Sequence, residues 1–212
     1  MKRVVLIIIS VWICAMVFWS ATSCSKEYDD YSSPTPFRGG ISGIIEGEYA
    51  EWDSVGISFG NGIVVSTPII DGKFTFSVLP TPNPEDLYLI IESEEMPKNV
   101  NCSNKDAQQC GMSFVALKYN GLSYTWIGIG QKSVASNSVT MVMYVYADRN
   151  VKIKGSYSGS ENGYNFNSEV NINLIQGFNT LLYTTNGSEN DGLTVTYKNG
   201  APPLDAVWTG LY

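Results

Sequence analysis

Short turn signals, spaced by strand-length runs, constrain the fold of this chain more than any other feature. Asn-Gly or Asp-Gly dipeptides stand at positions 61–62, 71–72, 120–121, 162–163, 191–192 and 199–200. They favour positive φ angles at both central residues, which lets a two-residue turn follow the twist of its flanking strands. Their spacing predicts a series of antiparallel strands joined by tight hairpins.

The runs between the turns alternate apolar and polar residues, as half-buried strands do. Clear examples are Val55, Ile57 and Phe59 before one turn and Phe74, Phe76 and Val78 after the next. The 13 tyrosines and 20 glycines also favour β structure. No long window of residues 24–212 keeps the 3.6-residue period of a helix. We predict an all-β fold, specifically an antiparallel β-sandwich.

The first 24 residues have the order of parts found in a secretory signal. Lys2 and Arg3 precede an almost wholly apolar run over 4–19, which is shorter than a typical transmembrane helix. Small residues at 21–23 then precede Cys24, as a signal peptidase with a narrow groove requires. We expect a lipoprotein signal peptide over 1–23 and lipid attachment at Cys24. The alternatives are an uncleaved anchor helix and an ordinary signal with an incidental Cys24.

Residues 1–30 resemble the start of a Bacteroidetes-type outer-membrane lipoprotein. In that group, a serine or lysine followed by acidic residues, directly after the lipidated cysteine, resembles a signal for transfer to the cell surface. Ser-Lys-Glu-Tyr-Asp-Asp at 25–30 is similar to this signal. The resemblance implies a palmitate-type acylated Cys24 and a location at the outer membrane, facing the cell surface. A periplasm-facing anchor is the alternative.

The rest of the chain divides by composition. Residues 24–39 are polar, contain Pro34 and Pro36 and show no apolar alternation, so we expect a flexible tether. We expect one β-sandwich domain over 40–130 and a second over 138–212, because alternation is lost between 130 and 137. One continuous sandwich is the alternative.

Three segments of the first half resemble a known module. They are Ile-Ser-Gly-Ile-Ile-Glu-Gly at 41–47, Asp-Gly-Lys-Phe-Thr-Phe-Ser-Val-Leu-Pro at 71–80 and Leu-Tyr-Leu-Ile-Ile at 87–91. Together they are similar to the small prealbumin-like β-sandwich of the carboxypeptidase-regulatory type. The resemblance implies a non-catalytic spacer, stabiliser or binding platform, although fold analogy alone assigns no function.

Charge and composition exclude several classes of function. The formal charge of −7 becomes −9 when Lys2 and Arg3 leave with residues 1–23, which argues against nucleic acid or anionic lipid as a partner. The chain has no histidine, so Ser-His-Asp and Cys-His pairs and the usual zinc ligands are missing. We therefore expect no metal, no cofactor and no enzyme activity. A glycosidase that uses carboxylates alone is the enzymatic alternative.

Cys102 and Cys110 stand in the polar stretch 99–111. In an exported protein such a pair more often forms a local disulfide than a metal site or two reactive thiols. We expect a Cys102–Cys110 disulfide that closes a short loop.

Two further candidate sites come from short stretches. Thr140, Tyr144 and Tyr146 share one face of the run 139–146, opposite an alternating Val/Met face. If the Val/Met face is core, the tyrosines form an exposed strip for stacking sugar rings; burial under a second layer is the alternative. Asp53-Ser54-Val55 resembles the O-glycosylation acceptor of the same lipoprotein group, with burial of Ser54 as the alternative.

These features lead to one expectation about function. We expect a lipid-anchored β-sandwich lipoprotein of the outer membrane or cell surface that acts as a non-catalytic binding or assembly module. Its partners would be the membrane, through the anchor, and an extracellular glycan or protein. A carboxylate-dependent glycan-active enzyme and a structural surface or adhesin subunit are the alternatives.

Overall fold

The computed structural model describes residues 39–60, 62–90, 99–161, 164–188 and 192–211. The predicted signal peptide, Cys24 and all but the last residue of the tether lie outside these ranges. The strands are β1 (Ile41–Ile44), β2 (Ser54–Ser58), β3 (Ile63–Pro68), β4 (Lys73–Phe76), β5 (Tyr88–Leu89), β6 (Val100–Cys102), β7 (Gln108–Tyr119), β8 (Tyr124–Ala135), β9 (Ser138–Ala147), β10 (Val151–Glu161), β11 (Tyr164–Leu174), β12 (Gly177–Ser188), β13 (Gly192–Asn199) and β14 (Val207–Gly210). Two short 3-10 helices, η1 (Glu48–Glu51) and η2 (Pro84–Asp86), lie between them. In the described ranges no helix is long and apolar enough to cross a membrane.

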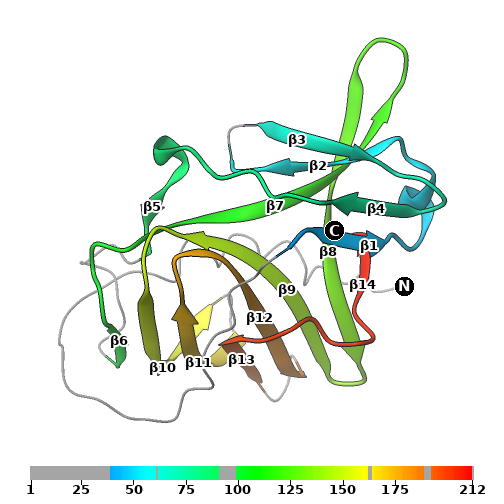
Figure 1. The fold of residues 1–212 in the computed structure, drawn as a ribbon. Coiled ribbons are helices and arrows are strands. Elements are labelled where there is room, and N and C mark those ends of the chain that lie inside the picture. Colours follow the sequence, from blue (N-terminus) through cyan, green and yellow to red (C-terminus); the bar gives the residue numbers. More distant parts are fainter. Residues whose placement is uncertain (1–38, 61, 91–98, 162–163, 189–191, 212) are drawn as a thin grey trace.

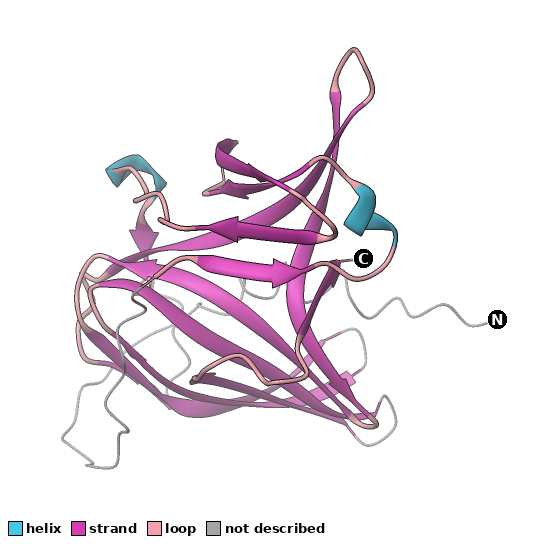
Figure 2. Cartoon of the chain, turned by 45° about the vertical axis from the view of Figure 1, so that its right-hand side comes forward, coloured by secondary structure: helices cyan, strands magenta, loops and turns pink. Residues whose placement is uncertain are grey.

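The prediction of an all-β, mainly antiparallel sandwich is confirmed. Strands β1 and β4 form a small sheet, and the large sheet has the order β3-β2-β7-β8-β9-β12-β13-β11-β10-β6 (Figure 1). Strand β5 adds to β7, and β14 adds to β8. Among these pairings only β11–β13 is parallel. Figure 2 shows that strands account for most of the described chain and that the larger layer is strongly curled.

The predicted turns have different outcomes. At Asp71-Gly72 both φ angles are positive, 50° and 71°, and a tight turn joins β3 to β4. At Asn120-Gly121 only Gly121 has a positive φ, and the Asn120 side chain closes the β7–β8 hairpin by accepting the N–H groups of Leu122 and Ser123. Asn199-Gly200 ends β13 and leads into a loop. The dipeptide at 162–163 lies outside the described residues.

Strand β8 belongs to two parts of the large sheet. Strands β7 and β9 pair directly only between residues 109–112 and 144–147. Beyond this point they diverge, and β8 pairs first with β7, through residues 124–129, and then with β9, through residues 131–135. Strand β14 pairs with β8 across this change of partner. One long strand, β8, therefore joins the part of the sheet that contains β2 and β7 to the part that contains β9 to β13.

Asp148 holds the end at which β7 and β9 meet. Its carboxylate accepts the N–H of Gln108 at 2.8 Å, and its own N–H donates to the Gln108 carbonyl at 3.0 Å. The Arg149 guanidinium forms an ion pair with the same carboxylate at 2.7 Å. Burial acts to raise the pKa of Asp148, but the hydrogen bonds and the charge of Arg149 together lower it below its usual value. Asp148 is therefore ionised at neutral pH and clamps the two strands together.

Sheet order departs from chain order in the C-terminal half. After β11 the chain forms β12 against β9, and β13 then returns between β12 and β11. Asn179, only 4% exposed, fixes the connection into β12: it accepts the N–H of Ile175 at 2.9 Å and donates to the carbonyls of Ile175 and Gly177 at 2.8 and 2.9 Å. A buried amide satisfied in this way stabilises the turn. Figures 1 and 2 show strands β9 to β13 curving beneath β7, which leaves one face of the sheet concave.

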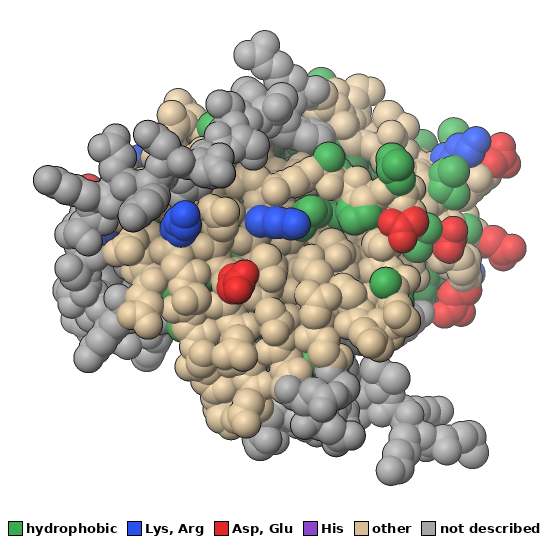
Figure 3. Space-filling view, turned by 90° about the horizontal axis from the view of Figure 1, so that it is seen from below, with side chains coloured by type: hydrophobic (Ala, Val, Ile, Leu, Met, Phe, Trp, Pro, Cys, Tyr) green, Lys and Arg blue, Asp and Glu red, His purple; other side chains and the backbone are tan. Residues whose placement is uncertain are grey.

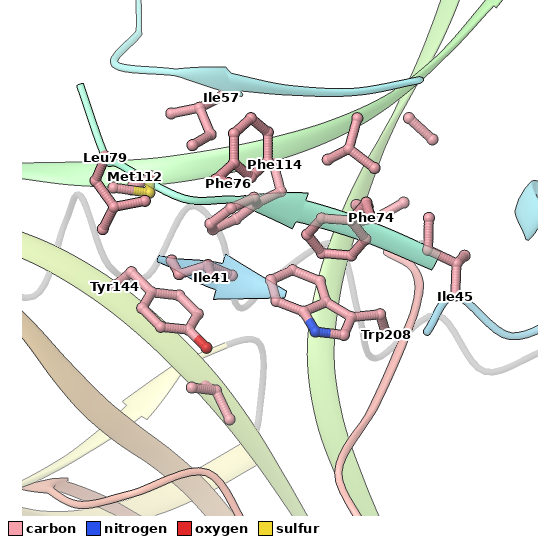
Figure 4. Close-up of a cluster of buried hydrophobic side chains, with 14 of the residues drawn as sticks. Ile41, Ile45, Ile57, Phe74, Phe76, Leu79, Met112, Phe114, Tyr144 and Trp208 are labelled. Atoms are coloured by element: carbon pink, nitrogen blue, oxygen red, sulfur yellow. The ribbon is translucent and has the colours of Figure 1, made fainter. Parts of the chain in front are cut away.

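The first hydrophobic core lies between the small sheet and the strands β2, β7, β8 and β9. Trp208 of β14 is its centre, with ring centroids 4.8 Å from Phe114, 5.1 Å from Phe74 and 6.2 Å from Tyr144. Figure 4 shows these rings turned toward one another beside Ile41 of β1. Aromatic packing of this kind joins four strands and holds the small sheet over the large one.

The second core lies on the concave face of the large sheet. It is formed by inward residues of β9 to β13 together with Val100 and Cys102 of β6. On β10 and β11 the register places Ile153 opposite Ile172 and Val151 opposite Leu174, so all four share this face. Their outward neighbours, such as Ser156, Ser158, Asn167 and Asn171, are exposed. Figure 3 shows a lower face made mainly of backbone and uncharged polar side chains (tan), with acidic side chains gathered toward its right-hand side.

The predicted domain boundary at 130–137 falls in the second half of β8 and its hairpin with β9. The ranges 40–130 and 138–212 both contribute strands to the same large sheet. The two ranges are therefore joined through this sheet. Alternation fades at 130–137 because β8 changes its pairing partner there.

Residues 40–91, which resemble a prealbumin-like module, do not form a separate sandwich in the structure. Strands β1 and β4 pair with each other, whereas β2, β3 and β5 belong to the large sheet. The aromatic core under β1 and β4 includes Phe114, Tyr144 and Trp208, which all lie after residue 91. The first half of the chain therefore depends on the second half for its core.

A substitution at Gly43 of β1 tests how tightly the small sheet packs on the aromatic core. A Cβ atom added there would lie 2.2 Å from Cδ1 and 2.3 Å from Nε1 of Trp208. Because the indole is packed on several sides, we expect Gly43→Ala to destabilise the protein by about 1 to 3 kcal/mol. The measurement is chemical denaturation, with Gly128→Ala as control, since a Cβ at Gly128 meets its nearest atom at 4.0 Å. Equal stability of the two variants would contradict this packing.

Candidate functional site

A large cavity of about 540 Å³ lies on the concave face of the large sheet. The pairing register explains which residues face it. Gly111 of β7 lies opposite Val145 of β9, and Val115 of β7 lies opposite Gly128 of β8, so alternate residues of all three strands point to one side. The opposite wall comes from β10 to β13. Its members are aliphatic or aromatic: Ile153, Tyr157, Val170, Ile172, Leu174, Leu181, Tyr183 and Tyr197.

Glycines in the β7 and β8 wall keep the cavity open. A Cβ atom at Gly111 would have only the Tyr88 hydroxyl within 4 Å, at 3.8 Å. Gly130, two residues after Gly128, is instead covered by the Leu211 side chain, whose Cδ2 would lie 2.9 Å from an added Cβ. Natural interiors are close-packed, so a wall built of backbone alone is a specific feature of this sheet.

The cavity opens to solvent along β7. Three of its lining residues are exposed: Tyr88 is 54% exposed, Trp126 is 68% exposed, and Ser113 lies between them on the cavity-facing side of β7. The deeper lining residues, such as Ile153 and Leu174, are almost fully buried. The mouth is thus marked by Tyr88, Ser113 and Trp126, and the cavity deepens toward β10 and β11.

No charged side chain is found among the described residues that line the cavity. The polar groups are the neutral side chains of Gln109 and Ser113 and tyrosine hydroxyls. Met141 and Met143 of β9 add flexible, polarizable side chains that adapt to the shape of a bound group. Among described residues there is also no cluster of three His, Cys, Asp or Glu side chains that could hold a metal. The described lining of this cavity is therefore apolar, with a few neutral polar groups.

On β9 the structure shows the alternative to an exposed tyrosine strip, because Tyr144 is buried. Tyr144 is only 6% exposed, stacks on Trp208 and donates its hydroxyl to Gln131 Oε1 at 3.0 Å. Burial raises its pKa to about 12. Tyr146 is half-buried and packs edge-on against Phe178, and the Thr140 hydroxyl bonds that of Thr184 at 3.0 Å. The cause is that both faces of β9 are covered, one by the aromatic core and the other by the curled sheet.

Cys102 and Cys110 are both buried, and the structure shows no disulfide between them. Cys102 lies on β6 and donates to the Asn104 carbonyl at 3.2 Å, whereas Cys110 lies on β7 and donates to the Gly111 carbonyl at 3.6 Å. Burial, together with the negative charge of Asp86, raises the pKa of Cys110 to about 11. The residues thus stand on two strands, not in one polar loop, and no bond joins them.

Ser54, the predicted O-glycosylation residue, is the first residue of β2 and is half-buried. It is flanked by Pro68 of β3 and Leu117 of β7. Its modification stays a prediction.

Sequence reasoning missed the cavity, although the chain carried a signal for it. Gly111, Gly128 and Gly130 interrupt runs that otherwise have strand character, and glycine inside a strand often marks a bend or the close approach of another group. The Val/Met alternation at 139–145 was expected to form core if the opposite tyrosine face is exposed. It lines the cavity wall and the second core together.

Compared with protein-family models, curated proteins and solved structures, the chain gives no significant match. Inference about its function therefore rests on the geometry of the cavity and its surroundings.

Thiol accessibility tests the placement of the two cysteines. In a chain that carries Cys14→Ser and Cys24→Ser, we expect neither Cys102 nor Cys110 to react with N-ethylmaleimide at pH 8 while the protein is folded. Burial hides both thiols, and the raised pKa keeps Cys110 protonated. Denaturation without reductant should expose both, as counted by mass spectrometry. A Cys102–Cys110 disulfide would instead leave both unlabelled until a reductant is added.

Proposed function

We propose that this protein binds an uncharged, apolar small molecule inside the curled sheet and that it does so without catalysis. The observation that carries the proposal is the cavity of about 540 Å³, whose described lining is apolar or neutral throughout. Ligand sites in proteins usually measure about 300 to 1,000 Å³ and combine an apolar wall with a few polar groups.

The lining favours a particular chemical class of ligand. Burying an ionised group without a partner costs several kcal/mol, and the described wall offers no opposite charge. Apolar area gains about 25 cal/mol for each Å² removed from water, so a hydrocarbon body is favoured deep in the cavity. Gln109 and Ser113 stand on the β7 side and can bond a small neutral head group there. A long-chain alcohol or a similar neutral lipid fits these demands.

The same lining weighs against the alternatives. A carboxylate-dependent glycosidase needs two acidic side chains facing one cleft, and the described lining contains no Asp or Glu. Glycan stacking was predicted on Tyr144 and Tyr146, and burial of Tyr144 removes that strip. A binding role is consistent with the predicted non-catalytic module, and its ligand is apolar.

We further propose that the protein acts while anchored to the outer membrane through Cys24. The support is the order of basic start, apolar run, small residues and cysteine over residues 1–24. Several acyl chains on one cysteine give stable anchoring, because each buried methylene contributes about 0.8 kcal/mol. Such a tether would place the cavity close to a reservoir of apolar molecules.

Binding is tested with a neutral fluorescent probe, N-phenyl-1-naphthylamine. We expect saturable binding, and displacement by dodecanol at lower concentration than by dodecanoate, because the cavity offers no partner for the carboxylate. Gly111→Leu should weaken binding at least about tenfold, which corresponds to about 1.4 kcal/mol, since the new side chain points into the cavity.

The matched control is Ser156→Leu, which places the same side chain on the exposed face of β10. It should bind the probe like the wild-type protein. Thermal unfolding shows whether both variants are folded. A folded Gly111→Leu protein that binds as tightly as wild type would overturn the proposal.

Lipid attachment is tested by Cys24→Ser. We expect the variant to incorporate no radiolabelled palmitate and to leave the membrane fraction, because the thiol is the group that accepts the lipid. A variant that keeps both the label and its membrane association would show that the anchor lies elsewhere.

A further inference from the structure

The β7–β8 hairpin projects from the body of the protein (Figures 1 and 2). Its end, residues 118–126, carries four exposed apolar or aromatic side chains: Tyr119, Leu122, Tyr124 and Trp126. Leu122 is at the tip and is 95% exposed. Large exposed apolar groups gathered on one projecting element indicate an interaction surface.

The aromatic side chains of the hairpin lie on the same side of the sheet as the cavity. Tyr119 pairs with Tyr124, and Leu117 pairs with Trp126. Counting back by two residues along β7 leads to Val115 and Ser113, which line the cavity. Trp126 itself belongs both to the exposed strip and to the cavity mouth. The strip therefore leads directly from the tip of the hairpin into the cavity.

Several polar groups of the tip bond within the hairpin, and the Tyr119 N–H donates to the Asp53 carboxylate beside it. Asn120 Oδ1 accepts the N–H groups of Leu122 and Ser123 at 3.1 and 3.0 Å, and the Asn120 N–H donates to the Ser123 carbonyl at 3.1 Å. The Tyr119 hydroxyl donates to the Gly121 carbonyl at 2.9 Å. Polar groups bonded in this way lose little when they leave water, so the tip can enter a medium of low polarity at small cost.

We propose that the end of this hairpin inserts into the interfacial layer of a neutral lipid membrane and sets the cavity mouth against it. Tyrosine and tryptophan favour this layer because one part of the ring system is apolar and another forms hydrogen bonds. Leu122 reaches the hydrocarbon, and the Tyr119 and Tyr124 rings, 5.1 Å apart, lie at the level of the head groups. A surface that stacks sugar rings would gain little from an aliphatic side chain, such as Leu122, at its tip.

Charge and chain length agree with a lipid surface as the partner. Residues 118–126 contain Lys118 and no acidic residue, in a chain of net charge −7. The acidic body would be repelled by anionic lipid but not by a zwitterionic surface, and the acidic group bonded to this end of the hairpin, Asp53, lies at its base, where it accepts the Tyr119 N–H. The 15 residue steps between Cys24 and Gly39 span at most about 50 Å, so an anchored protein can turn its hairpin to the membrane.

The test places an environment-sensitive dye at two matched leucines. Leu122→Cys and Leu204→Cys are each labelled with nitrobenzoxadiazole in the full chain carrying Cys14→Ser and Cys24→Ser, in which the remaining thiols are buried. Leu204 is also fully exposed but lies beside Asp205, which binds Ser133 in the second half of β8. With phosphatidylcholine vesicles, we expect a blue shift and higher emission at position 122 and no change at position 204.

The aromatic strip is tested in the Leu122→Cys background. Tyr124→Ser combined with Trp126→Ser should raise the vesicle concentration for half-maximal signal at least about tenfold, with the thermal midpoint as a check on folding. Equal responses at 122 and 204, or none at either, would overturn the proposal. So would a response at 122 to a soluble polysaccharide but not to lipid. Because these signals come from the hairpin, they are independent of probe binding in the cavity.

Discussion

The contact between Trp208 and the aromatic rings of β4, β7 and β9 holds the two layers of this protein together. Trp208 is 2% exposed, and truncation of such a residue typically costs about 3 to 5 kcal/mol. Its backbone also binds the first strand region, since its carbonyl accepts the Glu46 N–H at 2.8 Å. The small sheet near the start of the described chain is thus completed by the last strand. Formation of this core requires contacts between residues far apart in sequence, which is typical of slow-folding β proteins.

The sequence predicted local structure well because hairpins depend on local chemistry. Asp71-Gly72 has the expected backbone, and the runs at 54–58, 113–119 and 151–157 are strands. Sheet order was not predictable, because alternation defines a strand's two faces but not its neighbours. The insertion of β13 between β11 and β12 and the divergence of β7 and β9 depend on long-range pairing. For the same reason two domains were expected, whereas both ranges contribute strands to one large sheet.

The tyrosines of β9 show where face assignment from alternation is insufficient. Alternation placed Thr140 and Tyr144 on one face and Val139, Met141 and Met143 on the other, and it left open whether the tyrosine face is exposed or buried. In a strand covered on both sides, both faces are buried, and a tyrosine needs only one hydrogen-bond partner, here Gln131. The cavity was hidden by the same limitation: its open space comes from residues without side chains, Gly111 and Gly128, together with the curvature of distant strands.

The β7 strand connects these features, because residues two apart stay on one side of a strand. From Gln109 to Val115 its cavity-facing residues are neutral or small, and they leave room for a ligand against the sheet. From Leu117 onward the same side carries large side chains, and beyond the sheet body Tyr119 is exposed. A molecule that enters beside Trp126 would remain in contact with this single face from solvent to the buried wall of β10 and β11. The change from aromatic to glycine along one strand therefore separates the exposed mouth from the interior of the cavity.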